Sequence, residues 1–309
     1  MQLFVDVTQS FYEVLSRQAD ARNYRSEIEA NEERRGELLA LKRVARARAA
    51  EIATVEAAIA TLEASSANTR GLLDAARETL SFLTGLPPGV ELIDDQVRPT
   101  AVPALDFWLA RVEDRPDLRQ ARSNVDASEE NIEAARAARR PSLDLSANYY
   151  FRRPGISEDI NWDVQLSISQ PLFTGGLVQA QVREAMSQRR ANEITLEQAR
   201  DTAQRDVRSL YRTLRANLDQ VARLDRAVEL TQRNYELLRK DNRAGLATNL
   251  DVLQALANVY QTRRAWDVAS YAVKNNYERL RAISAQRNEN APGNDGAAPA
   301  GATIPATQR

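Results

Sequence analysis

The sequence predicts a mainly α-helical protein with one β-hairpin, in which long antiparallel coiled-coil hairpins continue from the two strands. Apolar and polar residues alternate in two stretches, residues 143–151 and 162–168, which is the period of a strand with two different faces. At residues 165–176, QLSISQPLFTGG, this alternation gives way to helical periodicity. Residues 177–243 contain neither glycine nor proline, so they predict one uninterrupted helix about 100 Å long.

The composition excludes most catalytic chemistry. The 309 residues include no histidine and no cysteine, so the usual zinc ligands, thiolates and histidine bases are missing, and we predict no catalytic, cofactor-binding or metal site. With 42 basic and 43 acidic residues the charges balance, so we predict no nucleic-acid partner. No run of eighteen apolar residues predicts a transmembrane helix, and the first residues do not have the pattern of a signal peptide.

Residues 1–86 predict the first helical hairpin, although residues 42–50 offer neither a glycine nor a cap residue for its turn. The indication of a turn is an internal repeat that aligns residue n with residue n+200. Equivalent heptad positions are occupied by Val7, Val14, Ala21 and Ile28 and by Val207, Leu214, Val221 and Val228. The repeat predicts a reversal near residues 45–49, and it predicts that the first helix and a further strand pair begin before Met1. Without the repeat, residues 1–84 are equally compatible with one unbroken helix.

Residues 87–141 predict a connector. The first helical region stops at residues 83–89, LTGLPPG, and prolines continue into the linker. A short helix is expected at residues 107–113. Pro116 suits the first turn of another helix, which should run to Arg140 and stop before Pro141.

Residues 142–172 predict the β-hairpin, with turn chemistry at residues 153–159. Each strand is expected to have about eleven residues, or roughly 36 Å, which suits a tilted membrane-spanning strand. The pattern alone is also compatible with an amphipathic hairpin that lies on a soluble core.

Residues 173–287 predict the second helical hairpin. Gly245 should cap the first helix in a left-handed conformation, Thr248 should be the N-cap of the next helix, and Asp251 should be its N3 partner. The second helix, with heptad positions at residues 252, 259, 266, 273 and 280, should run to about residue 286. The tail, residues 288–309, is rich in proline, glycine and alanine and predicts disorder.

Roughly residues 5–286 resemble the outer-membrane efflux proteins of the TolC type. The resemblance is carried by Arg115-Pro-Asp-Leu118 with the helix after it, by residues 162–176, and by Gly245-Leu-Ala-Thr-Asn-Leu-Asp-Val-Leu253. It implies an outer-membrane homotrimer that extends into the periplasm, with helical hairpins forming a periplasmic tunnel and four strands per chain forming a transmembrane β-barrel in outer-membrane lipid. It also implies a periplasmic adaptor and an inner-membrane transporter as partners. This chain departs from that pattern in showing two strands.

The resemblance also assigns candidate sites. The periplasmic tip and aperture would involve Arg243, Gly245, Thr248, Asp251 and its repeat counterpart Glu51. Carboxylate rings, repeated threefold, could hold the tip closed there through bonds to Arg243; helix capping explains the same residues. Arg43, Arg46 and Arg48 are a candidate adaptor contact, or simply a solvated basic face. The barrel lumen would be lined by Asp144, Asn148, Asp163, Gln165 and Ser167. The lipid and interface residues would be Tyr149, Phe151, Trp162, Val164 and Leu166.

The resulting hypothesis is a passive exit duct of a tripartite efflux or type I secretion system, without enzymatic activity. The alternative is a soluble structural coiled-coil or scaffold protein, which the lack of a signal peptide and of any clear break in the first helical region favour.

Overall fold

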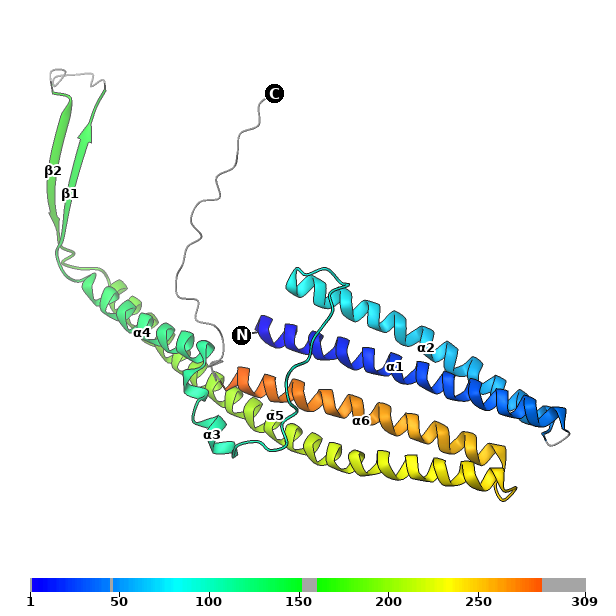
Figure 1. Cartoon of the computed structure of the whole chain (residues 1–309). Helices are drawn as coiled ribbons and strands as arrows, with labels where there is room; N and C mark the ends of the chain where they lie inside the picture. Colours follow the sequence, from blue (N-terminus) through cyan, green and yellow to red (C-terminus); the bar gives the residue numbers. More distant parts are fainter. Residues whose placement is uncertain (1, 45–46, 152–159, 285–309) are drawn as a thin grey trace, which may run out of the picture.

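The computed structural model describes residues 2–44, 47–151 and 160–284. In these ranges the chain forms six α-helices, one 3₁₀ turn and a two-stranded sheet (Figure 1). The elements are α1 (Gln2–Arg43), α2 (Ala49–Thr84), α3 (Leu105–Leu109), η1 (Val112–Asp114), α4 (Pro116–Ala137), β1 (Ser142–Tyr149), β2 (Trp162–Ser169), α5 (Leu177–Arg243) and α6 (Asn249–Ile283). The predicted turn at residues 153–159 and the predicted disordered tail lie outside the described residues.

Two helical hairpins lie side by side and have their turns at the same end of the molecule (Figure 1). α1 ends at Arg43 and α5 ends at Arg243, and the following helices begin at Ala49 and Asn249. The reversal predicted from the repeat alone is therefore confirmed, as is the uninterrupted helix at residues 177–243. None of the helices in the described ranges has a stretch long and apolar enough to cross a membrane.

Each hairpin has its own apolar core. Between α1 and α2 the core consists of Leu38, Ile52, Val55 and Ile59 near the turn, with Leu253 of α6, and of Val14, Leu73, Ala76 and Leu80 near the other end. Between α5 and α6 it follows the predicted heptads and includes Val207, Leu214, Val221, Val273 and Leu280. α1 and α6 join the hairpins, so the helices form a row in the order α2, α1, α6, α5 (Figure 1).

The connector differs from the single helix predicted at residues 107–113. α3 ends at Leu109, and the chain continues through a turn into η1. Backbone hydrogen bonds to the third preceding residue, such as Arg111 N to Trp108 O at 3.3 Å and Asp114 N to Arg111 O at 3.1 Å, tighten the chain here. As a result Trp108 and Val112 both reach the core beside α5 and α6.

The β-hairpin extends beyond the far end of α4 and α5 (Figure 1). Each strand has eight residues, so the predicted length of eleven was wrong; eight residues span roughly 26 Å. Pro141 has no backbone N–H to donate, which sets the first strand's start at Ser142. Beyond the paired register, Tyr150 N still donates to Asn161 O at 2.7 Å. α4, which was expected to reach Arg140, ends at Ala137 and packs along α5.

Candidate functional site at the helical tip and between the hairpins

The turn between α5 and α6 has the caps that its sequence predicts. Gly245 adopts φ +78°, a left-handed conformation that side chains other than glycine rarely take. Thr248 caps α6: its backbone N and its Oγ1 both donate to Asp251 Oδ2, at 2.8 and 2.6 Å, and its Oγ1 accepts from Asp251 N at 3.2 Å. These hydrogen bonds from Thr248 lower the pKa of Asp251. Capping therefore accounts for the position of both residues within the chain.

The turn between α1 and α2 repeats half of this arrangement. Arg48 occupies the cap position, and its backbone N donates to Glu51 Oε2 at 3.0 Å, as Thr248 does to Asp251. An arginine side chain cannot accept a hydrogen bond, so the second half of the capping box is missing. Arg43 and Arg48 are exposed, while Arg46 lies outside the described residues. Their predicted contact with an adaptor stays a prediction.

Replacing Thr248 with alanine should destabilise α6 by about 0.5–2 kcal/mol, because it removes the hydroxyl that bonds both to Asp251 N and to the Asp251 carboxylate. Arg48→Ala at the equivalent position of the repeat is the matched control and should change stability by less than about 0.5 kcal/mol, since the lost side chain makes no cap bond. Urea unfolding followed by circular dichroism measures both. Equal losses in the two variants would contradict this assignment.

A buried arginine fastens the α5–α6 turn to α1. Arg34 Nε donates to Asn249 Oδ1 at 2.8 Å, and its terminal nitrogens reach Asn242 Oδ1 at 2.5 Å and Glu37 Oε2 at 2.8 Å. Glu37 Oε1 in turn accepts from Arg239 at 2.7 Å. The first hairpin thus holds the last turn of α5 and the first turn of α6 at the same point.

Within one copy, Arg243 and Asp251 have different partners. Within the chain, Arg243 pairs with Glu37 at 3.6 Å, whereas Asp251 bonds to Thr248. Burial raises the pKa of Glu37, but the hydrogen bonds from Arg239 and Arg34 outweigh burial, so the pKa is lowered and the carboxylate stays ionised. Whether Asp251 and Glu51 form rings between copies of the chain stays a proposal.

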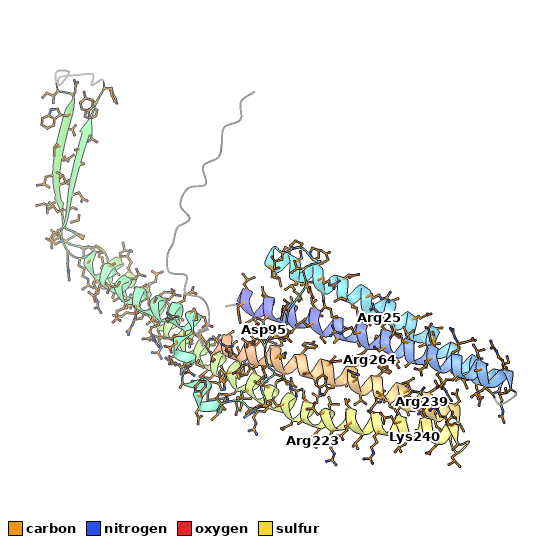
Figure 2. The ribbon with its side chains drawn as sticks, in the orientation of Figure 1. Arg25, Asp95, Arg223, Arg239, Lys240 and Arg264 are labelled. Carbon is orange, nitrogen blue, oxygen red and sulfur yellow. The ribbon has the colours of Figure 1, made fainter. Side chains whose placement is uncertain are left out.

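Farther from the turns, the contact between α1 and α6 is also polar. The buried polar side chains in this part of α1 are Asn23, Glu27, Asn31 and Arg34, spaced three or four residues apart. At its centre, Arg264 of α6 pairs with Glu27 at 2.5 Å and lies with its guanidinium carbon 4.5 Å from the centre of the Tyr24 ring. Asn23 donates to Asp267 at 2.7 Å. We call this contact the polar seam; Figure 2 labels Arg264 within it and Arg239 nearer the turns.

Two carboxylates lie beside Arg264, and burial disfavours the ionised form of both. Burial raises the pKa of Glu27, and the hydrogen bond and charge of Arg264 only partly offset it. Burial likewise raises the pKa of Asp20, whose carboxylate lies 3.9 Å from Arg264. Glu27 therefore depends on Arg264 to remain ionised in a site that is nearly closed to water.

The sequence analysis missed the polar seam. Its signal was available: these polar residues recur every three or four positions, on a face of α1 other than the one that carries the heptad residues Val14 and Ile28. Such a stripe indicates that two helices meet through hydrogen bonds and ion pairs. Bonds of this kind can be exchanged for others at little cost in apolar burial, whereas the cores inside each hairpin cannot.

The β-hairpin has one apolar and one polar face, as predicted. Directly paired residues share a face, and the pairs Leu143–Ile168, Leu145–Leu166, Ala147–Val164 and Tyr149–Trp162 form the apolar face. The pairs Asp144–Ser167, Ser146–Gln165 and Asn148–Asp163 form the other, where Asn148 donates to Asp163 at 3.0 Å. Tyr149, Phe151, Trp162, Val164 and Leu166 are all exposed, so a large apolar surface has no cover within the chain. The predicted lumen and lipid sides remain predictions.

A two-faced β-hairpin that continues into paired helices of this length defines a class: outer-membrane proteins of the TolC type. The family of outer membrane efflux proteins matches residues 111–286 of this chain. Since the match covers more than half of the 309 residues, the chain belongs to this family and is an outer-membrane protein that extends into the periplasm. Within the described residues, no group of three or more acidic side chains is placed to hold a metal ion.

Characterised relatives agree with this assignment. The chain is 27% identical to the alkaline protease secretion protein AprF of Pseudomonas aeruginosa over 71% of its length and 48% of the relative's. It is 27% identical to the outer membrane protein TolC of Escherichia coli over 68% of its length and 46% of the relative's. The crystal structure of the outer membrane protein VceC of Vibrio cholerae has the same fold, with a TM-score of 0.73 at 17% identity, over 92% of this chain and 69% of that one. The chain spans about half the length of the curated relatives it matches.

Proposed function

We propose that the chain forms, as a homotrimer, the exit duct of a tripartite efflux or type I secretion system. The observation that carries the proposal is the continuity between the two-faced hairpin and α5, a single helix of 67 residues. A helix of that length is about 100 Å long. In this proposal one chain therefore has the apolar face of its β-hairpin in lipid and its helical turns far away in the aqueous periplasm. The soluble scaffold that the helices alone also allowed disagrees with the outer-membrane location of this family.

In this proposal the chain catalyses no reaction. An inner-membrane transporter supplies the energy, a periplasmic adaptor meets the tip near Arg43, Arg46 and Arg48, and substrates pass when the tip opens. Opening would move the second hairpin relative to the first. The polar seam supports this, because its bonds can be exchanged while the apolar core between α5 and α6 stays intact.

The test is a deletion of the native gene in its own host, followed by complementation. If the proposal is right, the gene product is recovered in the outer-membrane fraction as a heat-sensitive trimer, and the deletion strain accumulates a fluorescent efflux dye or retains a secreted protein. Complementation restores export. A monomer in the soluble fraction, or unchanged export for every substrate of the host's pumps, would overturn the proposal.

A further inference from the structure

The outer helices of the four-helix row, α2 and α5, have opposite charge on the faces that no other element of the described chain covers. Both lie at the edges of the row, α2 beside α1 and α5 beside α6 (Figure 1). The outward heptad positions of α5 are basic with one exception: Arg205, Arg212, Asp219, Arg226, Arg233 and Lys240. We call this series the α5 stripe. Lys240, which Figure 2 labels near the turn, is exposed.

Other exposed charges flank the α5 stripe. The flanking basic residues, which lie farther from the turn, are Arg208, Arg215 and Arg223. The flanking acidic residues, which lie nearer the turn, are Glu229 and Glu236. Arg223, which Figure 2 labels on α5, is exposed as well. The outer face of α5 is therefore mainly basic.

The exposed stripe of α2 has the reverse pattern. Four carboxylates and one arginine alternate there with small residues: Glu56, Ala60, Glu63, Ala67, Arg70, Asp74 and Glu78. In the described chain, ion pairs within these two stripes are limited to the local pairs Arg205–Asp206 and Asp74–Arg77. Most of these charges therefore form no ion pair within a single copy.

We propose that the opposite charges of these two stripes set the register in which α2 of one copy meets α5 of the next. The inference rests on the proposed homotrimer and specifies how its copies meet. α2 and α5 lie at opposite edges of one copy, so the contact is heterologous and closes into a ring rather than a symmetric pair. The small residues on α2 let the backbone of α5 approach closely.

Rotation about a ring axis leaves height along the axis unchanged, so residues that meet must lie at similar distances from the turns. Arg70, the one arginine of the α2 stripe, lies roughly 32 Å along the helix from Ala49, where α2 begins. Asp219, the one carboxylate of the α5 stripe, lies roughly 36 Å from Arg243, where α5 ends. The difference of about 4.5 Å is one that an arginine side chain covers.

The other charges follow the same register. Each carboxylate of the α2 stripe then lies opposite an arginine of α5, in the pairs Glu56 and Arg233, Glu63 and Arg226, Asp74 and Arg215, and Glu78 and Arg212. Glu229 and Glu236 lie opposite Ala60 and Ala53, so they meet no like charge. The single inverted pair, Arg70 and Asp219, is decisive, because sliding the helices by one heptad would place Arg70 beside another arginine. Like charges brought together in this way disfavour wrong registers.

The chain has no cysteine, so an introduced pair can be tested without background. Ala67 and Ala222 are exposed alanines on the two facing surfaces, roughly 27 Å from the start of α2 and roughly 32 Å from the end of α5. In outer membranes that contain the protein, oxidation of A67C/A222C should give a ladder of covalent dimer and trimer. A disulfide requires Cα atoms within about 7 Å, and the two sites lie at opposite edges of one copy, so bonds form only between copies.

Two controls fix the register. A67C and A222C alone should stay uncrosslinked, because a heterologous contact brings no residue beside itself. A53C/A222C should also fail, since Ala53 lies about 21 Å nearer the turn than Ala67. Arg70→Asp should lower the yield of A67C/A222C about two- to five-fold, as expected for an exposed ion pair, and Asp219→Arg in the same protein should restore it.

The outcomes separate the inference from the proposed function. A trimer that exports substrates but does not crosslink through A67C/A222C, or that crosslinks equally through A53C/A222C, overturns this register and leaves the duct intact. Crosslinking of A67C alone would show a symmetric contact and overturn the ring. Protection of these sites by the adaptor instead of a second copy would also overturn the inference. Absence of any oligomer in the membrane overturns the proposed function as well.

Discussion

Replacing Trp108 with alanine should lower the free energy of unfolding by about 3–5 kcal/mol, the largest loss expected from a single residue of this chain. Trp108 is 1% exposed and packs edge-on against Tyr277 of α6, with ring centres 6.2 Å apart. Its indole Nε1 donates to Pro103 O at 3.3 Å. The substitution therefore leaves a cavity in the core that joins the connector to the second hairpin, and it leaves the Pro103 carbonyl without this donor.

Chemical unfolding measures this loss when it is followed by far-ultraviolet circular dichroism, which reports helix content and does not rely on tryptophan fluorescence. Phe82→Ala is the matched control, because Phe82 is an aromatic residue that is 87% exposed; it should cost less than about 0.5 kcal/mol. If Trp108→Ala unfolded with the same midpoint as Phe82→Ala, the connector would not be packed as the structure shows.

Replacing Arg264 with alanine should cost about 2–4 kcal/mol, because it leaves the carboxylate of Glu27 buried without its partner. Partial exposure of Arg264 and uptake of a proton by Glu27 keep the loss below the largest values for buried pairs. Since the pKa of Glu27 is raised already, the protonated form needs no counter-charge, and the loss should shrink as the pH falls through that pKa.

The neighbouring Arg263 supplies the control, since it is exposed and lies in none of the ion pairs of the described chain. Arg263→Ala should change stability by less than about 0.5 kcal/mol. The double variant Glu27→Leu with Arg264→Met should recover most of the loss, because a buried ion pair and apolar side chains of similar volume often contribute alike. A loss in Arg264→Ala that is independent of pH and unrepaired by the double variant would contradict the role of Glu27.

In export assays the same variant reports on the proposed opening. If the polar seam holds the second hairpin against the first, Arg264→Ala should raise the sensitivity of cells to antibiotics that the outer membrane normally excludes, whereas Arg263→Ala should not. Loss of stability without increased leakage would separate the seam's structural contribution from its part in gating.

Periodicity in the sequence was sufficient to predict the long helix α5 and the two strands. Alternation predicted both strands and their faces, and the absence of glycine and proline predicted α5 with the bounds that the structure shows. Thr248, Asp251 and Gly245 predicted the second turn because capping chemistry is local. The first turn, whose residues 42–50 carry neither glycine nor a cap residue, was reached only through the repeat, which transfers the second turn's position to the first.

Other features depend on contacts between residues far apart in the chain. Strand length was overestimated because alternation continues past the point where pairing stops. The connector helix was drawn too long because its tight turns follow from the packing of Trp108 and Val112 against the second hairpin. The sequence analysis did not anticipate that Arg243 pairs with Glu37, because Glu37 belongs to the other hairpin and is distant in the sequence.

The sequence by itself determined which segments are strands and helices, where most of them end, and which face of each is apolar, since these depend on neighbours within a few positions. Only the tertiary structure decided that the two hairpins meet largely through polar residues such as Asn23, Glu27 and Arg34, with Leu253 as an apolar contact near the turns, and that α2 and α5 are left at the edges. The physical reason is that a charged side chain on a helix is equally compatible with water and with a buried partner. Which of the two it meets is fixed by the position of a helix encoded elsewhere in the chain.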